Sequence, residues 1–317
     1  MGSETSPELL VVDFNNPKMN AGSNCWSSAC KDIRKAFETH GCFVALYDNI
    51  SPQLHDSIFK ATQEVLDLPI QTKLKNITEK PYHGYTGQIP IAPLHEATGI
   101  DYANTLHGAH SFTTLMWPQG NQFFCETTMS FAKAVAEIEK MVVMMFFESY
   151  GVDKYAEAHS NATTYFLRLM KYDPPSEGET TLGLPPHTDK SFITVLYQNH
   201  ISGLQTRSRD GQWINVQFPA ASFLVMAGDA CKAWSNDRVF SATHKVIMDT
   251  ERKETRYSTG LFSFLSKTLE VPVELVDDEH PLKFKPLAHI DLLKFFATEQ
   301  GRRSQNLLED FVGKSGE

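Results

Sequence analysis

The segment 184–264 contains residue types that bind metals, at spacings suited to a shared site. His187 and Asp189 are two positions apart, and alternate side chains of an extended chain point to the same face, so they would lie side by side if 185–197 is a strand. His244 follows a candidate hairpin and could complete the set from another strand. Two imidazoles and one carboxylate on one face of a metal are the ligands of many non-haem Fe(II) oxygenases. The sequence therefore predicts an iron site with three open coordination positions.

A candidate anchor for an organic acid follows these residues. Arg256 and Ser258 are also two positions apart, in the strand-like run RYSTGLFSF. A guanidinium group binds a carboxylate through two parallel hydrogen bonds, which a lysine cannot reproduce. We therefore expect Arg256 and Ser258 to bind one carboxylate from the same side.

Each of these short motifs is weak alone, because the chain contains a second copy of both. His289 and Asp291 repeat the first motif, but they lie in a helical pattern where residues two apart diverge by roughly 200°. Arg302 and Ser304 repeat the second motif without a strand pattern around them. A single histidine in an apolar sheet is usually a hydrogen-bonded core residue. The ordered set of five residues is what indicates a site.

The order of these five residues resembles the plant-type Fe(II)/2-oxoglutarate-dependent dioxygenases. Other family-like segments are Gly203-Leu204-Gln205, Asp210-Gly211-Gln212-Trp213, Gly228-Asp229 and Leu115-Met116-Trp117-Pro118. The resemblance implies that His187, Asp189 and His244 bind Fe(II). It further implies that Arg256, Ser258 and Tyr172 bind 2-oxoglutarate, that O2 is the oxidant, and that ascorbate stimulates turnover.

The sequence departs from the common family pattern at two places. Met170-Lys171-Tyr172-Asp173 stands where many members have Asn-Tyr-Tyr-Pro, and Tyr47-Asp48-Asn49 stands where many have Asn-His-Gly. The first variant is similar to the branch of glucosinolate side-chain oxidases. The iron site is intact, whereas the substrate, and the effect of Met170 and Lys171 on cosubstrate binding, stay open.

Three phenylalanines are candidate substrate contacts. Phe262 falls on the strand face of Ser258, and its counterpart in the family often lines the substrate pocket; Phe192 and Phe264 are weaker candidates. Aromatic lining favours a small, largely apolar specialised metabolite. The resemblance implies hydroxylation with release of succinate and CO2, while desaturation, ring closure and dealkylation stay open.

Other functions compete with this one. An ascorbate-dependent iron oxidase of the same fold would keep all five residues without using 2-oxoglutarate. A zinc hydrolase also uses His and Asp ligands. A small-ligand-binding barrel with a silent metal site is the non-enzyme alternative, although such a protein is expected to have lost a ligand.

The elements that position these residues indicate an α+β fold with a mainly β core. Between 162 and 264, short β-branched and aromatic runs alternate with turn signals, which predicts a double-stranded β-helix, or jelly roll. Helical patterns at 26–40, after Ser51-Pro52 and at 122–150 predict an N-terminal helical region and a long supporting helix. Segment 80–112 is expected to be an irregular loop. We expect a division into 1–120, a catalytic core at 121–288, and a covering helix in 289–317.

Composition limits the partners and the compartment. The 317 residues carry a formal net charge of −9, which argues against nucleic acids and anionic membranes. The 5 cysteines form no C-x-x-C pair, so a disulfide framework is not expected. No signal region or long apolar run is visible. We expect a cytoplasmic monomer that binds a small molecule.

Overall fold

Two facing β-sheets form the centre of the computed structural model, which describes residues 8–304 and 306–313. The larger sheet has the order β1 (Val11–Asp13), β2 (Cys42–Leu46), β10 (Ser222–Ala227), β7 (Ile193–Gln198), β12 (Arg256–Leu265), β5 (Thr163–Tyr172), β4 (Ala92–Asp101) and β3 (Thr86–Ile89). The smaller sheet has the order β6 (Leu182–His187), β11 (His244–Ile247), β8 (Leu204–Arg207) and β9 (Trp213–Asn215). The predicted α+β jelly-roll fold is confirmed.

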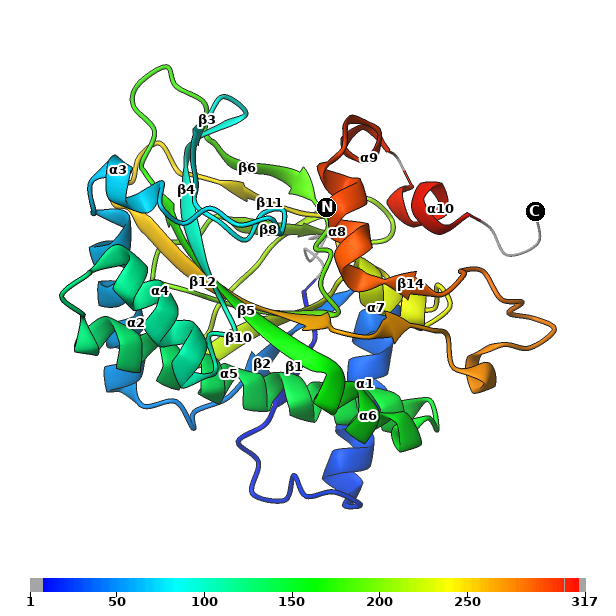
Figure 1. Cartoon of the computed structure of the whole chain (residues 1–317). Coiled ribbons are helices and arrows are strands. Elements are labelled where there is room, and N and C mark those ends of the chain that lie inside the picture. The colour runs from blue at the N-terminus through cyan, green and yellow to red at the C-terminus, as the bar shows by residue number, and fades with distance from the viewer. Residues whose placement is uncertain (1–7, 305, 314–317) are drawn as a thin grey trace, which may run out of the picture.

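The two faces of the large sheet pack against different layers. Helices α1 (Asn24–Thr39), α2 (Pro52–Leu66) and α5 (Gln122–Ser149) lie on one side of it (Figure 1). A second, smaller apolar cluster lies between the sheets and includes Val44, Met170, Leu196, Leu224 and Val246. Because side chains alternate along a strand, β5 and β12 each present one row to the helices and one row to the interior.

The sequence signals for the helices are confirmed. The Ser51 side chain accepts a hydrogen bond from Leu54 N–H and Pro52 opens α2, as the N-terminal signal predicted. Gly41 follows α1 with φ of 70°, and a Cβ there would lie 2.0 Å from the Phe240 carbonyl oxygen. Only glycine fits this turn, which directs the chain from α1 into β2.

Two expectations about local structure were wrong. Segment 185–197 is not one strand, because β6 ends at His187 and β7 begins at Ile193. Segment 80–112 is not an irregular loop, because it contains β3, β4 and the start of α4 (Leu106–Met116). His95 and Gly99 weaken the strand pattern of β4 in the sequence. The segment nevertheless forms a strand, because it pairs with β5, which is distant in the chain.

The C-terminal region returns to helix, as predicted. Helix α8 (His289–Ala297) follows the two-stranded pair β13 (Thr268–Leu269) and β14 (Leu287–Ala288). The His289 ring contacts the Leu265 N–H and the Lys190 carbonyl, which ties α8 to the end of β12 and to the loop after β6. The remaining elements are α3 (Ile70–Lys73), α6 (Ala156–Ala162), α7 (Asp229–Trp234), α9 (Glu299–Arg303), α10 (Leu307–Val312), η1 (Asp153–Tyr155) and η2 (Val273–Leu275). Within the described ranges, we find no helix with the length and apolar character needed to cross a membrane.

Candidate active site

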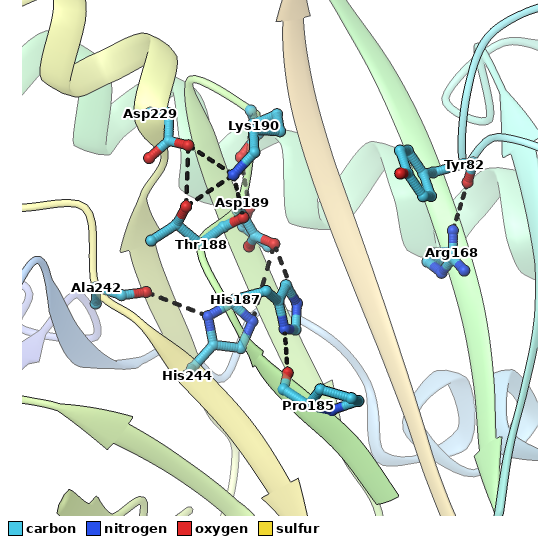
Figure 2. A network of polar contacts seen from close by, with 12 residues as sticks. Tyr82, Arg168, Pro185, His187, Thr188, Asp189, Lys190, Asp229, Ala242 and His244 are labelled. Atoms are coloured by element: carbon cyan, nitrogen blue, oxygen red, sulfur yellow. Dashed lines mark hydrogen bonds and ion pairs between the residues drawn. The ribbon is translucent and has the colours of Figure 1, made fainter. Parts of the chain in front are cut away.

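Three metal-binding side chains converge between the sheets. His187 ends β6 and pairs in register with His244 at the start of β11, while Asp189 comes from the following loop. One ligand atom from each residue lies within 4.8 Å of the others. Asp189 Oδ1 is 3.9 Å from His187 Nε2 and 3.8 Å from His244 Nε2 (Figure 2). The structure thus brings together the three residues selected from the sequence, although a turn and not a continuous strand places Asp189.

The backbone fixes the orientation of both imidazoles. His187 Nδ1 lies 2.8 Å from the Pro185 carbonyl oxygen, and His244 Nδ1 lies 3.3 Å from that of Ala242. If each Nδ1–H donates to its carbonyl, each Nε2 presents a lone pair to the shared centre, as in many metal sites. Burial and the neighbouring His244 lower the pKa of His187 to about 3, which favours the neutral form that binds metals.

A buried ion pair supports the loop that carries Asp189. Lys190 Nζ lies 2.6 Å from Asp229 Oδ2, and Thr188 Oγ1 donates to the same carboxylate oxygen at 2.9 Å. The Asp229 N–H donates to the Asp189 carbonyl at 2.8 Å. Asp189 Oδ2 itself is buried without a hydrogen-bond partner among the described residues. A buried carboxylate oxygen in this state fits a cation at the centre of the three ligands.

An arginine without an acidic partner lies on the wall of the same interior. Arg256 is 2% exposed and donates to Ser258 Oγ at 3.2 Å and to Gln198 Oε1 at 2.9 Å. Its carbon Cζ lies 4.8 Å from the centre of the Tyr172 ring. No ion pair to Arg256 occurs in the described ranges, and its Nε has no partner. A buried guanidinium of this kind fits the carboxylate of a bound organic acid.

Sequence reasoning missed two residues of this region. Gln198 pairs in register with Ser258 on the neighbouring strand β7, which explains its contact with Arg256. His95 pairs with Tyr172 from β4, and its pKa is lowered to about 3 by burial and by Arg168, His187 and Arg256. Both follow from strand register, which local spacing does not reveal.

Met170 stands where the common family pattern has asparagine, and its side chain lies on the interior face of β5. Met170 pairs with Ser258, and its sulfur lies 3.7 Å from the Tyr172 hydroxyl oxygen. The thioether is a weak acceptor where the common family pattern has an amide. Lys171 points to the other face and lies 3.3 Å from Asp173. Of these two departures, only Met170 therefore lies beside the candidate acid anchor.

The three candidate aromatic residues have different surroundings. Phe262 and Phe264 are half-buried on the interior row of β12, the row that also carries Arg256. Phe192 is 0% exposed, and its ring packs against Phe147 on the helix side of the sheet at a centroid distance of 6.2 Å. The expectation that Phe192 lines a substrate pocket is therefore corrected: β7 begins after Phe192, and the turn places its ring in the main core.

Two protein families match different parts of the chain. The 2OG-Fe(II) oxygenase superfamily matches residues 161–264, which contain all three candidate metal ligands and Arg256. A family described as the N-terminal region of a non-haem dioxygenase in morphine synthesis matches residues 10–98. Together they cover both the strand-rich region and the N-terminal helices.

Whole-chain comparisons agree with these matches. A probable 2-oxoglutarate-dependent dioxygenase AOP1.2 of Arabidopsis thaliana is 43% identical, with 96% of each chain covered. The 2-oxoglutarate-dependent dioxygenase AOP3 of the same plant is 32% identical, with 99% of each covered.

Solved structures show the same fold. The dioxygenase for auxin oxidation from rice has a TM-score of 0.81 at 24% identity, covering 96% of this chain and 100% of that one. JOX2, solved with 2OG, Fe and JA, has a TM-score of 0.79 at 20% identity, covering 98% and 92%. The chain therefore belongs to the 2-oxoglutarate-dependent dioxygenases, enzymes that use Fe(II), 2-oxoglutarate and O2.

Proposed function

We propose that His187, Asp189 and His244 bind the iron of this oxygenase, and that Arg256 binds 2-oxoglutarate beside it. Ser258 and Tyr172 complete the acid anchor, and Gln198 orients the guanidinium. One observation carries the proposal. The same interior contains a group of three possible metal ligands and a buried arginine that has no ion pair among the described residues.

Each group has a separate task in this proposal. Fe(II), when bound, supplies the oxidative decarboxylation of 2-oxoglutarate to succinate and CO2 and the oxidation of a substrate C–H bond. Arg256 neutralises the far carboxylate of the cosubstrate, whose burial in the barrel would otherwise be costly. The Pro185 and Ala242 carbonyls hold the imidazoles in place, and the surrounding apolar side chains keep water from the reacting groups.

The proposed substrate is a small specialised metabolite with an apolar body. Phe262 and Phe264 supply an aromatic wall on the strand that carries Arg256. Hydroxylation is the proposed outcome, and desaturation, ring closure and dealkylation are the alternatives to be separated by product mass. Ascorbate is proposed to stimulate turnover.

Succinate yield tests the proposal. The chain is incubated with Fe(II), 2-oxoglutarate, O2 and a metabolite library, and we expect one succinate per substrate oxidised. Zero succinate with continued oxidation would support the ascorbate-dependent oxidase. Anaerobic hydrolysis with zinc would support a hydrolase, and ligand binding without any product would support a silent barrel.

We also propose that the protein acts as a monomer in the cytoplasm, without nucleic-acid or membrane partners. The net charge of −9 supports the absence of nucleic-acid and membrane partners. Light scattering on the purified chain tests whether it is a monomer, and a fluorescent fusion in plant cells tests the compartment. A dimer mass, or fluorescence confined to an organelle, would contradict them.

A further inference from the structure

A second guanidinium lies on the interior row that contains the acid anchor. Arg168 is at the middle of β5, on the face that also presents Tyr172 and Met170. Its register partners are Gly99 on β4 and Gly260 on β12, so neither neighbouring strand places a side chain directly beside it. Figure 2 shows Arg168 to one side of the three metal ligands, with its side chain bonded to the Tyr82 carbonyl.

The hydrogen bonding of Arg168 is incomplete. A guanidinium has five N–H donors, whereas the one partner found in the described ranges is the Tyr82 carbonyl oxygen. The buried Lys73 and Lys190 each contact a carboxylate, whereas the half-buried Arg168 has no ion pair among these residues. Arg256 has the far carboxylate of 2-oxoglutarate as its proposed partner. Arg168 is left as a half-buried cation without an ion pair in the described ranges, so its remaining N–H groups are available to a ligand.

The interior row of β5 leads from Arg168 through Met170 to Tyr172, so the guanidinium and the acid anchor share one wall. Burial lowers the pKa of Arg168, while Tyr172 and Asp189 raise it. His95, which faces the same interior, has its pKa lowered by burial and then by Arg168 and His187. These directions agree with the strand register, which places Arg168, His95 and Tyr172 on one interior wall.

Aromatic rings lie next to this cation. Phe166 lies two residues before Arg168 on the interior row of β5, and it pairs in register with Phe262 on β12. Their ring centroids are 6.0 Å apart. They cover the two glycines: a Cβ on Gly99 would lie 2.0 Å from the Phe166 ring, and one on Gly260 would lie 2.7 Å from the Phe262 ring. This part of the interior wall thus combines an apolar surface with one positive charge that has no ion pair in the described ranges.

We propose that Arg168 binds an anionic oxygen group of the substrate, so that the enzyme oxidises small organic acids whose apolar body lies against Phe166 and Phe262. This inference rests on the proposed oxygenase function and narrows its substrate class. Arg168 is a specificity-determining residue in this proposal and takes no part in binding 2-oxoglutarate. A carboxylate and a sulfonate offer the same chemistry, and matched probes separate them.

The test uses the full chain with Fe(II), 2-oxoglutarate and O2. The probes are a panel of aromatic and alicyclic monocarboxylates, each paired with its methyl ester and its sulfonate analogue, and oxidation is followed by mass. We expect oxidation of acids or sulfonates and at least a tenfold lower kcat/KM for the esters. Oxidation of esters alone, or no oxidation of any anionic probe, would overturn the inference.

Variants assign the effect to Arg168. Arg168→Met is expected to raise KM for the accepted acid at least tenfold, and Arg168→Lys, which keeps the charge and loses the planar fork, to give a smaller increase. Lys171→Met is the matched control, because it removes a cation from the opposite face of β5. The assignment would be overturned if Arg168→Met and the control had the same KM for the accepted acid. It would also be overturned if Arg168→Met lost 2-oxoglutarate binding while its KM for the acid stayed unchanged.

The same experiment separates this inference from the proposed function. Wild-type chain that binds 2-oxoglutarate only with Fe(II) but oxidises no anionic probe would refute the inference alone. A wild-type chain without Fe(II)-dependent binding of 2-oxoglutarate would refute the proposed function. Should Arg168→Met fail to fold in thermal unfolding, the comparison of acid and ester in the wild-type chain still decides.

Discussion

At the scale of single residues, the site is defined by charges that the described chain does not balance. Asp189 Oδ2 and Arg256 Nε are both buried without a hydrogen-bond partner among the described residues. Burying a polar atom without a hydrogen-bond partner destabilises the folded chain unless a bound group interacts with that atom. A cation beside Asp189 and an organic acid beside Arg256 satisfy both requirements.

Replacing Arg256 tests the acid anchor directly. Truncating one partner of a buried, hydrogen-bonded charge pair costs about 2 to 5 kcal/mol, so Arg256→Ala should raise KM for 2-oxoglutarate by about 30-fold or more. Steady-state succinate formation at varied 2-oxoglutarate measures this change. Arg252→Ala, which removes an arginine whose side chain is 55% exposed, is the control. Equal KM values in the two variants would contradict the assignment.

Several residues of this site could be predicted from the sequence because their chemistry depends on local spacing. Arg256 and Ser258 lie in one strand, and His187 and Asp189 are close in the chain. Gln198 and Arg168 could not be found in this way, because their roles depend on the register of β7 and β5 with β12. Phe192 was misplaced because β7 begins one residue after it.

At the scale of elements, the loop between β6 and β7 depends on the ion pair of Lys190 and Asp229. Burial raises the pKa of Asp229, but the Lys190 ammonium and the hydrogen bonds that Lys190 and Thr188 donate hold it below its usual value. The pair therefore keeps a carboxylate charged beside the backbone of Asp189.

Breaking this pair should destabilise the protein strongly. Lys190→Met leaves Asp229 buried without its cation, at a cost of about 3 to 5 kcal/mol, whereas Lys190→Met with Asp229→Leu should recover most of this loss. The half-exposed pair of Lys232 and Asp237, at 3.5 Å, is the control, and Lys232→Met should cost less than about 1 kcal/mol. Urea unfolding measures all three variants. Similar costs for Lys190→Met and Lys232→Met would refute this account.

Helix α5 contributes a pH dependence through Glu139. This buried side chain accepts a hydrogen bond from Tyr165 at 2.8 Å, and burial raises its pKa from 4.5 to about 7. Between these values the folded chain retains a proton that the unfolded chain releases, so its contribution to stability falls as pH rises. Glu139→Gln should therefore be more stable than wild type at pH 8 by on the order of 3 kcal/mol, and nearly equal at pH 4.5.

Unfolding by urea at the two pH values measures this difference. Gln122→Glu, at the exposed start of the same helix, is the control for a change of charge. An equal stability difference between Glu139→Gln and wild type at both pH values would show that Glu139 does not titrate in this way.

The helices were easier to predict than the strands at this scale. Ser51, Pro52 and the apolar periodicity of α5 act locally, so their sequence patterns are reliable. Strand β4 contains Gly99 and His95, and it is stabilised by pairing with β5 from His95 to Asp101. Its identity therefore depends on partners that are distant in the sequence.

At the scale of the whole molecule, the N-terminal region contributes strands to the large sheet, which also carries Arg256. Strands β2 and β4 lie in the same sheet as β5 and β12. The jelly-roll fold was predictable from the strand-rich region, but these additions were not, because β2 pairs with β10 and β4 with β5, which are distant in the sequence. The division of the chain at 120 and 288 stays a prediction.

We propose that one interior binds iron first and 2-oxoglutarate beside it. Anaerobic calorimetric titration of the full chain with Fe(II) and then 2-oxoglutarate tests this most directly. We expect one Fe(II) per chain, binding of 2-oxoglutarate only after iron, and loss of both in His244→Ala, with Lys171→Met behaving like wild type. Unchanged binding of both ligands by His244→Ala would contradict the account.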